Sequence, residues 1–121
     1  MSKKILIVDD SESIREVVFY TLEKNGYDVL VGVDGKDALR YLNGQHLDLI
    51  ITDLYMPRMD GISLIREIRK NEHYKRTPIL FLTTESQHDK KMEAKSAGAT
   101  GWMVKPFIPD NLISIINKVM R

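Results

Sequence analysis

The sequence contains no cysteine. This absence excludes a disulfide framework, a zinc site built from thiolates and a cysteine nucleophile. Aromatic residues are also few, at 7% of the chain, whereas 43% of the residues are hydrophobic and 29% are charged. That balance is typical of a globular domain that buries an aliphatic core. A length of 121 residues suits one such domain, so we expect a single domain over residues 1–121.

Long apolar segments are missing as well. No stretch approaches the ~20 apolar residues that a membrane helix requires. Only four apolar residues follow the N-terminal Met1–Lys4, too few for the apolar part of a signal peptide. The formal net charge is +1, which indicates no basic surface for nucleic acid or a membrane. We therefore expect a cytoplasmic protein whose partners are neither nucleic acid nor membrane.

Five short runs rich in Ile, Leu and Val are present, at residues 5–8, 29–33, 47–52, 79–82 and 102–104. They show little polar alternation, which is typical of parallel strands buried on both faces. Between them lie stretches of helical character, at residues 12–25, 36–43, 62–71, 86–97 and 110–121. The fourth of these has few large apolar residues, so we expect a helix with marginal packing there. The alternation predicts an α/β fold, with a five-stranded parallel sheet flanked by five helices.

Polar side chains follow four of these runs. Asp9 and Asp10 follow the first, Asp53 the third, Thr83 the fourth and Lys105 the fifth. Because ligands bind beyond the carboxyl ends of parallel strands, we expect these side chains to meet at one edge of the sheet. Carboxylates about 4–5 Å apart repel by about 3–4 kcal/mol per pair at an effective dielectric near 20, so the cluster needs a cation. Mg²⁺ is commonly bound by carboxylates and phosphate oxygens together, so the pattern predicts a site for Mg²⁺ and a phosphoryl group.

Each of these residues has a simpler interpretation when it is taken alone. An aspartate such as Asp9 or Asp10 is a favoured helix N-cap after a strand, and Asp53 is a favoured first residue of a turn. Lys105 alone fits a solvated lysine, and Thr83 alone fits a hydroxyl that caps the next helix. It is their combination at the ends of four strands that favours a functional site.

Several neighbouring residues are expected to have structural or surface roles. Asp60 precedes an expected helix and suits its N-cap. Glu12 and Arg15 are expected on the solvated face of the first helix. The three histidines are scattered and lack the spacing of metal ligands.

Four segments of the chain resemble those of response-regulator receiver domains, most closely the free-standing CheY-like regulators. They are ILIVDDS (residues 5–11), DLIITDLYMPRMDG (48–61), TPILFLTTE (77–85) and AGATGWMVKPF (97–107). The resemblance covers essentially the whole chain. It implies a flavodoxin-like, CheY-like fold with the strand order 2-1-3-4-5. It also implies Mg²⁺ as the cofactor.

The resemblance further implies that Asp53 is the phosphoacceptor. It would receive the phosphoryl group from a phosphohistidine of a sensor histidine kinase or a histidine phosphotransfer protein. Asp9, Asp10 and Asp53 would bind Mg²⁺ together with the backbone carbonyl of Tyr55. On this interpretation the protein catalyses its own phosphorylation and dephosphorylation, and it is not an enzyme that acts on a separate substrate.

The resemblance also implies a route from the site to a partner. Thr83 and Lys105 would contact the phosphoryl oxygens, and the Lys105–Pro106 peptide is cis in the family. Phosphorylation would change a partner-binding face within residues 86–121, where a downstream effector protein binds. Trp102 occupies a position on that face that usually holds tyrosine or phenylalanine, and its indole N–H needs a partner when buried. We expect either a switch residue or a fixed anchor there, and either a monomer or a phosphorylation-dependent dimer.

Functions of several classes share parts of this chemistry. The favoured hypothesis is a single-domain response regulator of two-component signal transduction, with chemotaxis as one pathway. A phosphorelay intermediate or a phosphate sink without a motor target is the alternative. A phosphorylation-independent binding module would lack a site residue, and none is missing. A phosphohydrolase that forms an aspartyl-phosphate usually has an Asp-x-Asp pattern after the first strand, whereas this chain has Asp9-Asp10-Ser11.

Overall fold

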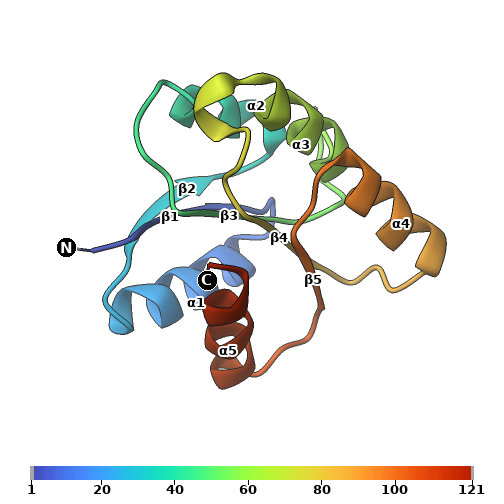
Figure 1. Cartoon of the computed structure of the whole chain (residues 1–121). Coiled ribbons are helices and arrows are strands. Elements are labelled where there is room, and N and C mark those ends of the chain that lie inside the picture. Colours follow the sequence, from blue (N-terminus) through green and yellow to red (C-terminus); the bar gives the residue numbers. More distant parts are fainter. Residues whose placement is uncertain (1, 121) are drawn as a thin grey trace.

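The computed structural model describes residues 2–120 and contains one five-stranded sheet (Figure 1). All neighbouring strands are parallel, and their order is β2-β1-β3-β4-β5. This confirms both the predicted sheet and its strand order. The strands are β1 (Lys4–Val8), β2 (Asp28–Gly32), β3 (Leu49–Thr52), β4 (Ile79–Thr83) and β5 (Gly101–Val104).

Helices cover both faces of the sheet, as Figure 1 shows. Helices α1 (Glu12–Lys24) and α5 (Pro109–Val119) lie on one face. The other face is covered by α2 (Gly35–Ala38), α3 (Gly61–Lys70) and α4 (His88–Ala97). Two short 3₁₀ helices, η1 (Leu39–Tyr41) and η2 (Glu72–Tyr74), follow α2 and α3.

The core consists of two layers, one on each side of the sheet. Side chains of β1 alternate between them: Leu6 and Val8 pack toward α3, whereas Ile5 and Ile7 pack toward α1 and α5. All four are at most 2% exposed, so the strand is buried on both faces. This is why its sequence shows an unbroken apolar run instead of the alternation of a half-exposed strand.

The predicted helix at residues 36–43 is wrong in extent. Helix α2 ends at Ala38, and the chain tightens into η1 before Leu42 leaves helical geometry. Within η1, the Tyr41 hydroxyl donates to the Val31 carbonyl at 2.8 Å and holds this segment against β2. Nucleation of a helix is energetically unfavourable, and a helix of one turn gains few further hydrogen bonds by elongation. Tertiary contacts such as this one therefore decide its length.

The marginal packing predicted for residues 86–97 is confirmed. Ala94 is the buried residue of α4, and Met92 is 48% exposed. None of the helices within residues 2–120 has the length and apolar character needed to cross a membrane.

The register of the strand pairs decides which residues lie together at the carboxyl edge of the sheet. In the β1–β3 pair, Val8 lies opposite Thr52, so the residues that follow, Asp9 and Asp53, leave the sheet side by side. A backbone hydrogen bond of 2.9 Å from Asp53 N to the Val8 carbonyl closes this arrangement. In the β4–β5 pair, Thr83 lies opposite Val104, which brings Lys105 to the same edge.

Candidate functional site

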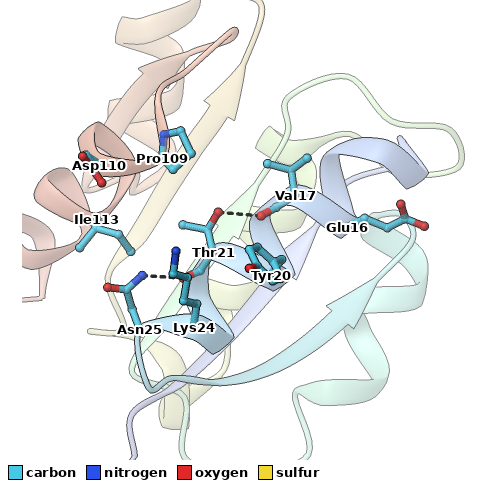
Figure 2. Close-up of a pocket in the computed structure, with 9 residues that line it drawn as sticks. All are labelled: Glu16, Val17, Tyr20, Thr21, Lys24, Asn25, Pro109, Asp110 and Ile113. Atoms are coloured by element: carbon cyan, nitrogen blue, oxygen red, sulfur yellow. Dashed lines mark hydrogen bonds between the residues drawn. The ribbon is translucent and has the colours of Figure 1, made fainter.

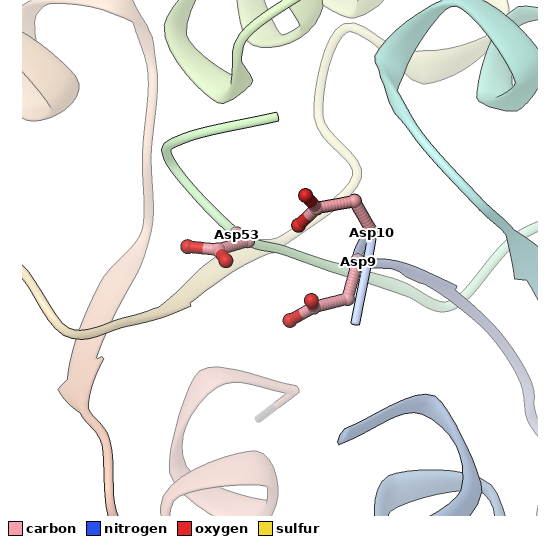
Figure 3. Close-up of side chains that lie close together, drawn as sticks. All are labelled: Asp9, Asp10 and Asp53. Atoms are coloured by element: carbon pink, nitrogen blue, oxygen red, sulfur yellow. The ribbon is translucent and has the colours of Figure 1, made fainter. Parts of the chain in front are cut away.

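The three predicted carboxylates meet at the carboxyl edge of the sheet (Figure 3). Each of Asp9, Asp10 and Asp53 offers one oxygen, and these oxygens all lie within 4.8 Å of one another. Asp9 is buried, Asp53 is half-buried and Asp10 is exposed. The cluster is therefore anchored in the fold on one side and accessible from solvent on the other.

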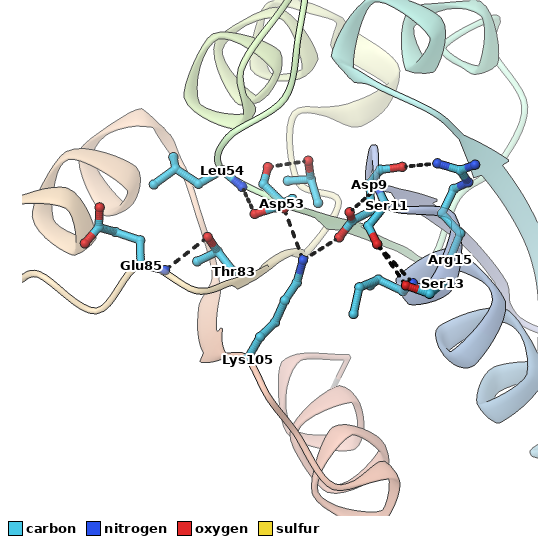
Figure 4. A network of polar contacts seen from close by, with 11 residues as sticks. Asp9, Ser11, Ser13, Arg15, Asp53, Leu54, Thr83, Glu85 and Lys105 are labelled. Carbon is cyan, nitrogen blue, oxygen red and sulfur yellow. Dashed lines mark hydrogen bonds and ion pairs between the residues drawn. The ribbon is translucent and has the colours of Figure 1, made fainter.

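Lys105 supplies the positive charge that the cluster requires. Its ammonium group donates to Asp9 Oδ2 at 2.8 Å and to Asp53 Oδ2 at 3.1 Å (Figure 4). The Lys105 side chain is only 10% exposed, and the Lys105–Pro106 peptide is cis, as the resemblance implied. Three carboxylates against one ammonium leave a formal local charge of −2. The interpretation of Lys105 as a solvated lysine is wrong.

Burial and charge shift the pKa values of this pair. Burial raises the pKa of Asp9 above its usual value, and the nearby Lys105 ammonium only partly opposes this. Burial alone would lower the pKa of Lys105, but the hydrogen bond and charge of Asp9, together with Asp53, outweigh it and raise the pKa. Lys105 therefore stays a cation at neutral pH, which suits a group that must face anionic oxygens.

The N-cap of α1 is Ser11, whose hydroxyl accepts from Ile14 N at 3.4 Å. The interpretation of Asp9 or Asp10 as that cap is therefore wrong. Asp9 uses its other oxygen, Oδ1, to accept from Ser11 N at 2.9 Å. Arg15, expected on the solvated face, instead donates to the Asp9 backbone carbonyl at 2.8 Å. These contacts fix the Asp9 carboxylate against the start of α1.

The loop after β3 folds back onto Asp53. Asp53 Oδ1 accepts from Leu54 N at 2.6 Å, and Gly61 N donates to the Leu54 carbonyl at 2.8 Å. A Cβ on Gly61 would lie 2.2 Å from the Asp53 carbonyl oxygen, so only glycine permits this approach. Asp60 caps α3 by accepting from Ser63 N at 2.8 Å, which confirms its predicted role.

Sequence reasoning missed Glu85 as a connecting residue. Its backbone N–H donates to the buried Thr83 hydroxyl at 3.3 Å, and its carbonyl accepts from the Trp102 indole N–H at 3.0 Å. Its carboxylate accepts from the Tyr55 hydroxyl. This hydrogen bond raises the pKa of Tyr55 and lowers that of Glu85. The only signal in the sequence was its position two residues after Thr83.

Trp102 is half-buried at the edge of the core. Its ring packs on Phe81 with centroids 5.2 Å apart, and its N–H is paired with the Glu85 carbonyl. The predicted need for an indole partner is confirmed. Hydrogen bonds thus connect Thr83 through Glu85 to Trp102, and the Thr83 carbonyl accepts from Lys105 N at 2.8 Å, next to the carboxylate cluster.

A groove to which we assign no chemistry lies elsewhere, between α1 and α5 (Figure 2). It has a volume of about 490 Å³ and includes Val17, Tyr20 and Ile113 among its walls. It contains none of the predicted site residues. The groove is therefore separate from the carboxylate edge.

The donor set at that edge fits Mg²⁺. The three side chains of the cluster are carboxylates, and hard oxygen donors are the ligands that Mg²⁺ prefers. Even with Lys105 in place, the cluster keeps a formal charge of −2, which favours the binding of a cation. An exposed oxygen donor on Asp10 leaves that side accessible to hydrated ions.

Comparison with known proteins identifies the family. The model of the response regulator receiver domain matches residues 5–117. The chain belongs to this family. Receiver domains act in two-component signalling and bind Mg²⁺ at an acidic pocket. The family match and the cluster therefore agree.

Individual relatives refine this assignment. The chain is 37% identical over 121 residues to the alkaline phosphatase synthesis transcriptional regulatory protein PhoP of Bacillus subtilis. That match covers 100% of this chain but 50% of PhoP, and the chain spans about half the length of most of the first curated relatives it matches. The structure of Vibrio cholerae chemotaxis protein CheY4 is 45% identical, with a TM-score of 0.95, and the match covers 98% of this chain and 99% of CheY4.

A further solved structure contains a metal. The receiver domain of sensor histidine kinase PA1611 from Pseudomonas aeruginosa has a magnesium ion coordinated in its active site cleft. It is 32% identical to this chain, with a TM-score of 0.91, and the match covers 99% of this chain and 98% of that one. The likeness of this receiver domain to CheY4 and PA1611 thus extends over nearly the whole of each chain.

Proposed function

We propose that this receiver domain accepts a phosphoryl group on the carboxylate of Asp53. The observation that carries the proposal is the Lys105 ammonium, held at 2.8 Å from Asp9 and 3.1 Å from Asp53 inside a cluster of three carboxylates. A carboxylate can attack phosphorus only if its repulsion with the incoming oxygens is reduced. Catalysis of phosphoryl transfer depends mainly on the positioning of the reactants and on the neutralisation of charge, and the residues at this edge of the sheet provide both.

Each residue of the site has a distinct role in the proposal. Asp9, Asp10 and Asp53 hold Mg²⁺ together with the backbone carbonyl of Tyr55. The cation, when bound, neutralises charge on the phosphoryl oxygens. Lys105 neutralises a further oxygen, and its burial keeps the ammonium close to Asp53. Asp53 is oriented for attack by its hydrogen bonds to Leu54 N and Lys105.

The donor in this proposal is a phosphohistidine of a sensor histidine kinase or a histidine phosphotransfer protein. An oxygen of Asp53 forms the new bond to phosphorus, and the phosphorus–nitrogen bond breaks. The electron pair of that bond stays with the imidazole, which takes up a proton. Water later attacks the phosphorus of the acyl phosphate, the bond between phosphorus and the Asp53 oxygen breaks, and inorganic phosphate leaves. The carboxylate is thereby restored, so the domain is a self-modifying switch and not an enzyme with a separate substrate. The proposed compartment is the cytoplasm, where ATP supplies the kinase.

The output in this proposal is the face formed by α4, β5 and α5. A phosphoryl oxygen on Asp53 would accept the O–H of Thr83 and draw this hydroxyl toward the site, away from Glu85 N, which now donates to it. The Glu85 carbonyl also accepts a hydrogen bond from the Trp102 indole. A movement of Thr83 that displaces Glu85 therefore also displaces Trp102, which lies in β5. An effector protein that binds residues 86–121 then distinguishes the two states. We propose a single-domain regulator, with chemotaxis as one pathway and a phosphorelay or phosphate sink as the alternative.

The test is Mg²⁺-dependent labelling with acetyl phosphate, followed by intact-mass spectrometry. The wild type should gain the mass of one phosphoryl group, and Asp53→Asn should gain none. Asp60→Asn is the matched control, because asparagine keeps the helix cap and Asp60 lies outside the cluster. Stoichiometric labelling of Asp53→Asn at another residue would remove Asp53 from its role. Transfer profiling against purified histidine kinases then identifies the partner.

A further inference from the structure

Arg58 has an unusual backbone conformation. It is the only non-glycine residue within residues 2–120 with a positive φ, at 67°. It stands at the centre of a three-residue turn, which a hydrogen bond of 2.7 Å from Met59 N to the Pro57 carbonyl closes. Tight turns of this kind with positive φ at the centre are rare and strained for residues that have a Cβ. Such strain persists only where surrounding contacts hold it.

The side chain of Arg58 supplies that contact. Its Nε donates to Asp34 Oδ2 at 2.8 Å, and its terminal nitrogen donates to Asp34 Oδ1 at 3.0 Å. This two-point geometry fixes the direction of the guanidinium as well as its distance. Asp34 itself is only 5% exposed, and its Oδ1 also accepts from Asp37 N at 2.8 Å to cap α2. The hydrogen bond from Arg58 is the largest cause of the lowered pKa of Asp34.

The ion pair joins the loops that follow β2 and β3, the two strands that flank β1. Asp34 follows β2, whose last residue, Gly32, accepts a backbone hydrogen bond of 3.2 Å from Asp9 N. Arg58 lies in the loop that leads from Asp53 to α3. The two loops also touch directly, since a Cβ on Gly35 would lie 2.6 Å from the Met59 carbonyl oxygen. Asp34 is therefore held in a fixed position, because β2, which it follows, is hydrogen-bonded to Asp9.

Side chains hold the loop from Tyr55 to Met59 against the rest of the fold. Its ends are fixed by buried Leu54 and by Asp60, which caps α3. Between them Tyr55 is 52% exposed, and Pro57 and Arg58 are exposed. The Tyr55 hydroxyl is held by Glu85 on the side of β4, and the Arg58 guanidinium is held on the side of β2. Met56 and Met59, both partly buried, also pack against the core, so the polar tethers at Tyr55 and Arg58 act beside these apolar contacts.

We infer that Arg58 is a positioning residue for the metal site. Its ion pair with Asp34 holds the loop of residues 54–60 so that the main-chain carbonyl of Tyr55 is in place before Mg²⁺ binds. The inference rests on the proposed function, which assigns that carbonyl to the metal. Without the ion pair, the loop must be ordered when the cation arrives, and that ordering lowers affinity.

The test variant is Arg58→Gly. Glycine adopts positive φ without strain, so the backbone keeps its turn while the ion pair is lost. We expect the affinity for Mg²⁺, measured by calorimetry, to fall about tenfold, as for other residues that orient metal ligands. We expect the melting temperature without Mg²⁺ to change by less than about 4 °C, because relief of strain offsets the lost pair. Labelling by acetyl phosphate should need more Mg²⁺ but reach the wild-type rate at saturation.

Two further variants keep the result interpretable. Arg58→Lys keeps the charge but loses the two-point geometry, and should also weaken Mg²⁺ binding. Its matched control is Arg40→Lys, because Arg40 makes a 2.8 Å ion pair with Asp37 in the same region, within α2 and η1. The control should bind Mg²⁺ as the wild type does. Asp34→Asn keeps an oxygen to cap α2, and the double variant with Arg58→Gly should lose no more affinity than either single variant.

The outcomes separate this inference from the proposed function. If the wild type binds Mg²⁺ and Arg58→Gly binds it equally well, Arg58 does not position the site, and the proposed function stands. If Arg58→Gly loses affinity only in step with its melting temperature, and Asp34→Asn does the same, the pair serves stability alone and the inference is wrong. If the wild type binds no Mg²⁺, the proposed function fails, and the inference fails with it.

Discussion

Replacement of Lys105 by methionine tests whether charge crowding governs the carboxylate cluster. Methionine has a similar length and keeps the apolar part of the side chain, so Lys105→Met removes mainly the ammonium group. The formal charge of the three carboxylates and Lys105 changes from −2 to −3, because the ammonium that pairs with Asp9 and Asp53 is gone. We expect the folded protein to lose stability when no divalent cation is present, and to regain part of it in Mg²⁺.

The size of the effect follows from the distances. At 2.8 Å and 3.1 Å, the attractions of the ammonium to Asp9 and Asp53 are each about 5–6 kcal/mol at an effective dielectric of 20. The cost of burying the ammonium, whose side chain is 10% exposed, offsets much of this gain. Removal of one partner of a buried ion pair usually costs about 3–5 kcal/mol. Because Asp10 is exposed and water reaches the cluster, we expect the lower end, about 3 kcal/mol.

The assay is thermal unfolding in EDTA and in Mg²⁺. For a chain of this length, a loss of about 3 kcal/mol corresponds to a fall of about 10 °C in melting temperature. Mg²⁺ should stabilise Lys105→Met more than the wild type, since the cation enters a more negative site and binds the folded state. Lys75→Met is the matched control, because Lys75 makes an exposed ion pair with Glu72 and its removal should cost less than about 1 kcal/mol.

Two results would refute this reasoning. An unchanged melting temperature of Lys105→Met in EDTA would mean that the ammonium does not relieve repulsion in the cluster. A large loss that Mg²⁺ does not reduce would assign the effect to packing of the side chain instead of its charge. Either result would remove the electrostatic basis of the proposed phosphoacceptor site.

Two other predictions use the path to β5 and the buried Asp34. Fluorescence of Trp102 should change when beryllofluoride binds together with Mg²⁺, because its indole hydrogen-bonds to Glu85, next to the Thr83 hydroxyl; a flat signal despite binding by calorimetry would exclude Trp102 from the switch. The pKa of folded Asp34 is held below its usual value, first by the hydrogen bond from Arg58 and then by that from Asp37 N. The ionised Asp34 carboxylate therefore contributes its full stabilisation above about pH 4, and this stabilisation disappears as the pH falls through the folded pKa. The gap in melting temperature between wild type and Asp34→Asn should therefore narrow as the pH falls below about pH 4, and a gap that stays constant there would contradict the assignment.

Much of the fold was predictable from local pattern. The apolar runs mark the strands because a strand covered on both faces has no solvent side on which to place polar residues. The same reasoning places Asp9, Asp53 and Lys105 at one edge, since parallel strands end on the same side of a sheet. The strand order came from the family resemblance, and the structure agrees with it. The length of α2 was not predictable, because contacts such as that of Tyr41 with Val31 decide where it ends.

By itself, the sequence determined which segments are buried and which chemical groups stand at the strand ends, because both depend on residue types at short spacing. Only the tertiary structure decided which distant groups meet. Glu85 links Thr83, Tyr55 and Trp102, and Arg58 holds an aspartate 24 positions away. No local periodicity records such pairs, since they exist only after the strands have taken their order and brought their loops together.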